Sequence, residues 1–122
     1  MVRGYIIVEG IRLGSWLENL KLSLIRIERS EFRNPGPDQP AVWTTVHFES
    51  SEYPERLATA LSEALDDNPS RWYTDFATDL EKFVIFPKRV FRYPIGDLAR
   101  RAEAQEYARS IGVPQWQVDW EA

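Results

Sequence analysis

His47 is the only histidine of the chain and the first residue to consider for chemistry. It lies in an alternating segment, residues 41–50, in which Glu49 shares its face. A histidine with a carboxylate two positions away on one strand face could act as a general base. No nucleophile lies nearby in the sequence, so a purely structural histidine is the competing interpretation.

Asp75 and Arg92 each lie among aromatic residues that are typical of strands. A charge in such a segment has to face solvent or find a partner, so an ion pair between these two is expected. A functional use of Asp75 stays open, because together with His47 and Glu49 it could form the site of a small enzyme. The chain has no cysteine and its acids are scattered, which predicts no metal site, and no motif predicts a cofactor.

The five tryptophans of the chain are candidates for a binding surface, because aromatic side chains are common anchors at interfaces. Trp72 is expected in the core, whereas Trp43, Trp116 and Trp120 are expected to be partly exposed. The residues that we consider for binding are Trp43, His47, Asp75, Arg92, Trp116 and Trp120.

The C-terminal tail, residues 115–122, alternates apolar and polar residues. Trp116, Val118 and Trp120 share one face of this segment, and polar residues take the other. The pattern predicts a last short strand or an extended segment that packs on an apolar surface. An arm with exposed tryptophans that binds a partner is the alternative interpretation.

Hydrophobic periodicity and turn residues divide the chain into strands and helices. Strands are expected at residues 5–13, 20–33, 41–50, 72–76, 83–86 and 89–93, and helices from about residue 51 and at residues 98–111. The apolar set slips by one residue at Leu24-Ile25, which predicts a β-bulge that brings both apolar sets inside. Residues 83–86 are apolar on both faces, so this strand is expected to be central and covered on both sides.

The expected order is strand, strand, strand, helix, strand, strand, strand, helix, followed by the tail. Clustered strands with short connections favour antiparallel pairing. We therefore expect an α+β fold with a mainly antiparallel sheet of about six strands and two helices packed on one face. A chain of 122 residues is expected to form a single domain, residues 1–122.

The composition argues against several classes of protein. Hydrophobic residues make up 43% and charged residues 28%, which is typical of globular chains and unlike disordered ones. The net charge of −4 and the absence of a recognition motif predict no nucleic-acid binding. No segment is long enough for a signal-peptide core or a membrane span, so a cytoplasmic protein without membrane contact is expected.

Several short motifs lie close together in the C-terminal half. They are Trp72-Tyr73-x-Asp75-Phe76, Val84-Ile85-Phe86, Arg89-Val90-Phe91-Arg92-Tyr93-Pro94, Gly96-Asp97, Gly112-Val113-Pro114 and Asp119-Trp120. On these motifs the chain resembles a group of small uncharacterised bacterial proteins. The resemblance implies a stand-alone bacterial domain, and it implies no activity, cofactor or catalytic residue.

Two classes of function stay open. The scarcity of titratable clusters favours a non-catalytic interaction or ligand-binding module over the small enzyme built around His47, Glu49 and Asp75. Open strand edges, the number of tryptophans, and the separation of acids at residues 49–67 from bases at residues 88–101 favour a homodimer. The sequence identifies no substrate, ligand or further partner.

Overall fold

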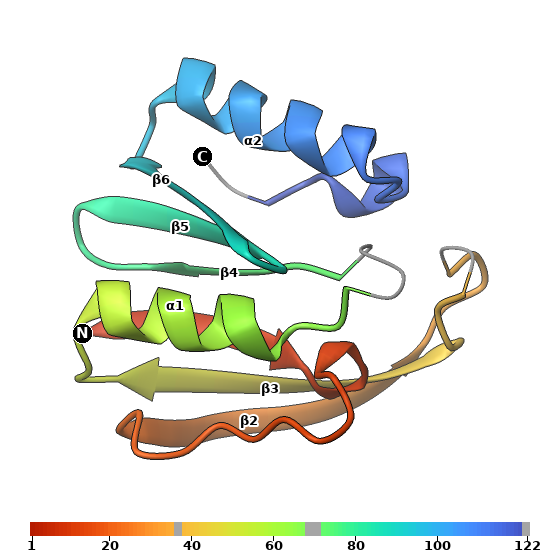
Figure 1. The fold of residues 1–122 in the computed structure, drawn as a ribbon, viewed down its shortest axis with the longest axis horizontal. Coiled ribbons are helices and arrows are strands. Elements are labelled where there is room, and N and C mark those ends of the chain that lie inside the picture. Colours follow the sequence, from red (N-terminus) through yellow and green to blue (C-terminus); the bar gives the residue numbers. More distant parts are fainter. Residues whose placement is uncertain (36–37, 68–71, 121–122) are drawn as a thin grey trace.

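The computed structural model of the protein describes residues 1–35, 38–67 and 72–120 (Figure 1). These residues form one antiparallel sheet of six strands in the order β2-β3-β1-β4-β5-β6. The strands are β1 (Val2–Ile7), β2 (Leu22–Glu31), β3 (Val42–Ser50), β4 (Thr74–Ala77), β5 (Glu81–Phe86) and β6 (Arg89–Pro94). The helices are α1 (Pro54–Ala64) and α2 (Leu98–Ser110), with short 3-10 turns η1 (Val8–Gly10) and η2 (Gln115–Gln117). The predicted α+β class, antiparallel sheet and order of elements are confirmed.

The two helices pack against opposite faces of the sheet, so the prediction that both lie on one face is wrong. In β5, Phe83 and Ile85 belong to the buried cluster that contains α1 residues. Val84 and Phe86 belong to a second cluster that contains α2 residues. A strand that is apolar on both faces needs an apolar partner on each face. Here α1 covers one face of β5 and α2 covers the other. The prediction that this strand is central and covered on both sides is confirmed.

The α1 face of the sheet is closed by the helix and by the chain that leads from η1 to β2. α1 begins at Pro54, a position where the missing N–H of proline breaks no helical hydrogen bond. Its buried stripe includes Leu57 and Leu61, which pack against side chains of β1, β3, β4 and β5. Leu17 and Leu20 of the connecting chain join the same cluster. The cluster therefore extends across most of the sheet.

On the other face, α2 packs over the end of the sheet formed by β5 and β6. Its N-cap is Asp97, whose Oδ1 accepts a hydrogen bond from the main-chain N–H of Arg100 at 3.1 Å. The chain leaves the helix at Gly112 with a φ of 90°, a conformation that favours glycine. No helix in the described ranges is long and apolar enough to cross a membrane.

The tail packs between α2 and the sheet, so the prediction that it belongs to the fold is confirmed, although residues 115–120, the part that the structure describes, form η2 and no strand. Val118 and Trp120 are buried there. The indole N–H of Trp120 donates to the hydroxyl of Tyr93 at 3.1 Å, and the Arg101 guanidinium donates to the main-chain oxygen of Trp120. Gln117 is also buried, because the turn breaks the strict alternation of the sequence.

β2 forms one edge of the sheet and carries the predicted bulge, where the pairing with β3 shifts between Leu24 and Arg26. The bulge does not bring both apolar sets inside, and that prediction is wrong. Leu22, Leu24, Ile25 and Ile27 are all exposed. An edge strand has one neighbour in place of two, and α1 does not extend over it.

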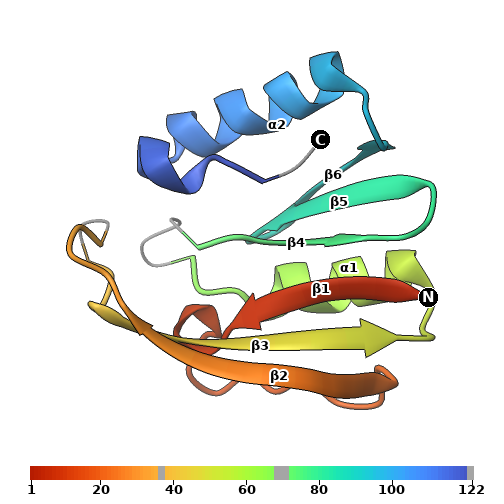
Figure 2. The same cartoon turned by 180° about the vertical axis from the view of Figure 1, so that it is seen from behind.

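The faces differ in how far they are covered. Seen from behind, β2, β3 and β1 form a broad surface with no helix in front of them (Figure 2). α2 lies beyond the β4–β6 end of this side (Figures 1 and 2). The uncovered half of the sheet therefore meets the tail near the middle of the molecule.

Candidate functional site

A cavity of about 180 Å³ lies where the uncovered half of the sheet meets the tail, and we call it the aromatic cavity. Six of its lining residues carry aromatic rings, namely Tyr5, Phe32, Trp43, Trp72, Tyr73 and Trp116. Ile7, Thr45, Gln117 and Asp119 complete the lining. Thus one wall comes from the sheet and another from the tail.

Strand geometry explains how residues far apart in the sequence meet here. Tyr5 and Ile7 are two positions apart in β1 and therefore share a face. The antiparallel register places Ile7 opposite Thr45 of β3 and Tyr5 opposite His47. The tail reaches the same place because α2 ends at Gly112 and η2 turns the chain back toward the sheet.

Trp116 stacks on two other rings of the aromatic cavity. The ring of Trp116 lies 5.9 Å from that of Trp43 with 20° between the planes, and 5.5 Å from Phe32 with 29° between the planes. The Trp43 indole N–H donates to the main-chain oxygen of Pro40, and the Trp116 indole N–H to that of Asn34, both at 2.9 Å. The indole N–H donors of both tryptophans are therefore engaged by the main chain.

The predictions of which tryptophans are exposed and which are buried are confirmed in part. Trp116 has 42% of its surface exposed, as expected, and Trp72 lies in the core. Trp43 and Trp120 were expected to be partly exposed, and both are buried. Trp43 is covered by its aromatic neighbours, and Trp120 is covered by α2. Of these, Trp43, Trp72 and Trp116 line the aromatic cavity.

A polar network lies beside the cavity and reaches it through Tyr5 and Tyr73. Asp75 and Lys82 make a buried ion pair, with 2.5 Å between Oδ1 and Nζ. Burial raises the pKa of Tyr5, and the charge of Asp75 and the neighbouring Tyr73 raise it further. Burial and the charges of Asp75 and Asp119 raise the pKa of Tyr73, whose hydroxyl donates to the main-chain oxygen of Gln117. Both tyrosines therefore keep their protons at neutral pH.

His47 has a different carboxylate partner from the one its sequence neighbours suggest. Its Nε2 lies 2.7 Å from Oε1 of Glu28 on β2, and the Arg26 guanidinium lies 3.2 Å from the same nitrogen. The hydrogen bond with His47 lowers the pKa of Glu28. Glu49 pairs with Arg3 at 3.2 Å. His47 therefore belongs to a charged cluster on the uncovered face, beside the cavity.

The hypothetical enzyme site of His47, Glu49 and Asp75 is not assembled. The three residues share one face, but Tyr5 of β1 lies between His47 of β3 and Asp75 of β4. Two strand spacings separate His47 from Asp75, which is about 10 Å. Each acid also has a cationic partner of its own, Arg3 for Glu49 and Lys82 for Asp75. Within the ranges described, no three His, Cys, Asp or Glu side chains are grouped so that they could hold a metal ion.

Arg92 lies on the α1 side and does not pair with Asp75, so that predicted ion pair is wrong. Arg92 is opposite Phe83 in the β5–β6 register, whereas Asp75 is opposite Val84 in the β4–β5 register. Alternation therefore places the two charges on different faces. Arg92 instead pairs with Glu81 at 2.6 Å and with Glu55 at 2.9 Å.

Tyr5, Tyr73, Phe32 and Asp119 are among the cavity residues that the sequence did not single out. Tyr5 and Tyr73 look like ordinary strand residues in the sequence, and only the β1–β4 pairing brings them together. Asp119 is one position before Trp120 in the tail, and its place at the cavity follows from the path of the tail. The residues next to each of these positions in the sequence therefore do not predict its place at the cavity.

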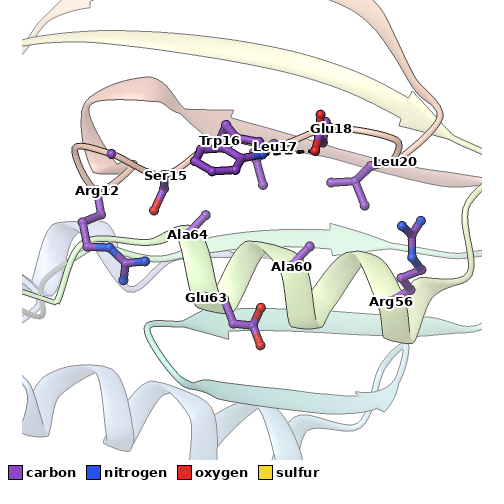
Figure 3. Close-up of a pocket in the computed structure, with 11 residues that line it drawn as sticks. Arg12, Ser15, Trp16, Leu17, Glu18, Leu20, Arg56, Ala60, Glu63 and Ala64 are labelled. Carbon is purple, nitrogen blue, oxygen red and sulfur yellow. Dashed lines mark hydrogen bonds between the residues drawn. The ribbon is translucent and has the colours of Figure 1, made fainter.

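A larger groove of about 370 Å³ lies on the α1 side, between α1 and the chain that leads to β2 (Figure 3). Ala60 and Ala64 face the loop across this groove, while the carboxylate of Glu63 points away from it (Figure 3). Arg56 is engaged by Glu52 and by the main-chain oxygen of Asn19, and the Trp16 indole donates to Glu18. The groove thus combines apolar side chains such as Leu17 and Leu20 with polar ones such as Arg12 and Ser15.

Comparisons with protein-family models, with curated proteins and with solved structures gave no match to this chain. The resemblance of the C-terminal half to a group of bacterial proteins therefore stays a hypothesis.

Proposed function

We propose that the protein is a non-catalytic ligand-binding domain whose binding site is the aromatic cavity. The observation that carries this proposal is the stacked pair of Trp43 from β3 and Trp116 from the tail, which walls a cavity on the uncovered half of the sheet. Concave sites lined by aromatic side chains with a few polar groups are typical of small-molecule binding.

The rigidity of the site supports this proposal. The indole N–H groups of Trp43 and Trp116 are fixed by main-chain oxygens, and the Tyr73 hydroxyl is fixed by Gln117. A preformed site loses less conformational entropy when a ligand binds. The partial exposure of Trp116 leaves an entrance from solvent.

The volume of the cavity limits the ligand. About 180 Å³ corresponds to about six water molecules at liquid density. Sites for drug-sized molecules occupy about 300–1,000 Å³. The ligand, or the part of a larger ligand that enters, is therefore a small group.

Two variants test the proposal with matched changes. A library of small polar and aromatic compounds is screened by thermal shift, and each hit is titrated by calorimetry. Trp116→Leu removes a cavity ring and should weaken binding by at least about tenfold, or about 1.4 kcal/mol. Trp16→Leu removes an exposed tryptophan on the other face and should leave the affinity unchanged. Equal losses in both variants, or no hit that depends on Trp116, would refute the proposal.

We further propose that two copies of the chain pair along β2. This ten-residue strand leaves one edge unpaired and exposes a run of apolar side chains, Leu22, Leu24, Ile25 and Ile27. Natural edge strands of this kind usually carry devices that prevent pairing. Antiparallel pairing of two copies centred on Ile27 places Arg26 opposite Glu28 of the second copy, so the charges are complementary.

The oligomeric state tests this second proposal. Light scattering coupled to gel filtration at tens of micromolar should give twice the 14.2 kDa of one chain. Ile27→Lys should shift the mass to that of a monomer, whereas Leu13→Lys, at a position 97% exposed in the loop before β2, should not. A monomeric mass for the unchanged protein would contradict the proposal.

A further inference from the structure

We propose that the aromatic cavity binds a small organic cation that carries a methylated ammonium group. This inference rests on the proposed function, because it specifies the ligand class of the same site. It follows from three features of the described residues: the orientation of the rings, the sign of the charge at the rim, and the kind of hydrogen-bonding groups that stay available.

The rings surround the cavity from more than one direction. Trp43 and Trp116 are nearly parallel, whereas Trp72 is tilted by 59° from Trp43 at a distance of 5.3 Å between ring centroids. Tyr5 and Tyr73 add two rings from the sheet side. The face of an aromatic ring carries partial negative charge and attracts a cation within about 6 Å, and tryptophan and tyrosine are the strongest of these partners.

The charge at the cavity has one sign. Its lining contains an acid, Asp119, and no Lys, Arg or His among the described residues. Asp119 acts on the cavity wall, since its charge contributes to the raised pKa of Tyr73. Arg33 lines a separate hollow that shares Phe32 and Trp116 with the cavity, and it is absent from the cavity lining. An anion would therefore meet a like charge and no cationic partner.

The polar groups distinguish a methylated ammonium from other cations. A primary ammonium has three N–H donors to satisfy, and a metal ion requires several oxygen ligands. The lining is mostly aromatic, and among the described residues Asp119 supplies its one carboxylate, while the O–H of Tyr73 and the amide N–H of Gln117 already have partners. A trimethylammonium group has no N–H to satisfy and is compact enough for about 180 Å³.

The first experiment compares two ligands of the same shape. Choline and its neutral isostere, in which a tert-butyl group replaces the trimethylammonium group, are titrated into the full chain by calorimetry. Choline should bind at least tenfold more tightly than the isostere. Equal affinities would overturn the inference and leave the proposed function standing, because the cavity would then bind by shape alone.

The second experiment separates charge from ring contact. Asp119→Asn should weaken choline binding several-fold and leave the neutral isostere unaffected, while Asp79→Asn, at an exposed turn between β4 and β5, should change neither. Circular dichroism checks that each variant is folded. If choline does not bind while another compound binds in a Trp116-dependent way, the inference is wrong and the proposed function stands. If no compound binds in that way, both are wrong.

Discussion

The two faces of the sheet differ in how they are covered and in what they carry. On the α1 face, one helix and the chain before β2 cover an apolar cluster that runs from β3 to β5, and the groove of about 370 Å³ lies between them. On the other face, α2 and the tail cover only one end, and the cover stops at the aromatic cavity. The polar network of Tyr5, Asp75 and Lys82 and the cluster around His47 both lie on this second face.

This difference indicates a division of roles. The α1 face contributes mainly hydrophobic burial, because its cluster extends across most of the sheet. The half-covered face combines aromatic rings, a buried ion pair and an entrance to solvent. Binding is expected where the cover ends, because ligand sites need both a packed wall and access.

The largest expected effect comes from removing the cover of the half-covered face. Deletion of residues 115–122 removes Val118 and Trp120 from the cluster under α2. Loss of one buried tryptophan costs about 3–5 kcal/mol, so the melting temperature should fall by many degrees. Trp116→Leu, which removes the exposed ring alone, should cost much less. Full stability of the deletion variant would show that the tail is an interaction arm and not a cover.

Breaking the buried ion pair should give the next largest effect. Lys82→Met leaves the Asp75 carboxylate without its partner and should cost about 3–5 kcal/mol in urea unfolding. The double variant with Asp75→Asn should recover more than half of this loss. On the α1 side, Glu81→Gln breaks the exposed pair with Arg92 and should cost less than about 1 kcal/mol. Similar costs for the two single changes would contradict the distinction between the faces.

The raised pKa of Tyr5 predicts that the folded protein loses stability at alkaline pH. Burial, Asp75 and Tyr73 raise its pKa, so the folded protein keeps this proton where the unfolded chain, with a pKa of about 10, releases it. The neutral hydroxyl therefore contributes its full stability below about pH 10, the pKa of tyrosine in the unfolded chain. This contribution is lost as the pH rises toward the pKa of Tyr5 in the folded protein. From about pH 9 to about pH 11, the unchanged protein should lose about 1.4 kcal/mol more than Tyr5→Phe. The free energy of unfolding is measured in urea at each pH for both proteins. Equal losses for the unchanged protein and for Tyr5→Phe would refute the prediction.

The smallest expected effect concerns the N-cap of α2. Asp97→Ala removes the acceptor of the Arg100 main-chain N–H and should lower the free energy of unfolding by about 1 kcal/mol. Glu103→Ala, an exposed change within α2, serves as the control and should stay within about 0.5 kcal/mol. A denaturation midpoint that is unchanged in Asp97→Ala would show that the tail alone holds α2 in place.

Local patterns in the sequence predicted much of the fold. The apolar run in β5 and the register slip in β2 each have a signal within a few residues, and the cover on both faces of β5 and the presence of the bulge in β2 are confirmed. The exposure of Ile27 and its neighbours had no such signal, because it follows from the place of β2 at the edge of the sheet. The order of the strands also decides which face each helix covers, and spacing along the chain does not reveal it.

The candidate site was predictable only in part. Trp43 and Trp116 were singled out as binding residues, and both line the aromatic cavity, while Asp75 lies in the network beside it. The partner of Asp75 was predicted wrongly, because Arg92 is displaced by one position in the register and points to the other face. Tyr5 was missed, since its role depends on pairing with strands that are distant in the sequence.

A single NMR titration tests most directly whether binding belongs to the half-covered face. Choline is added to labelled protein, and the five indole N–H signals report on both faces at once. The signals of Trp43 and Trp116 should shift in a saturable way, and that of Trp16, beside the groove on the α1 side, should stay constant. A saturable shift of Trp16 with Trp43 and Trp116 unchanged would place binding in the groove on the α1 face and contradict the assignment of the aromatic cavity.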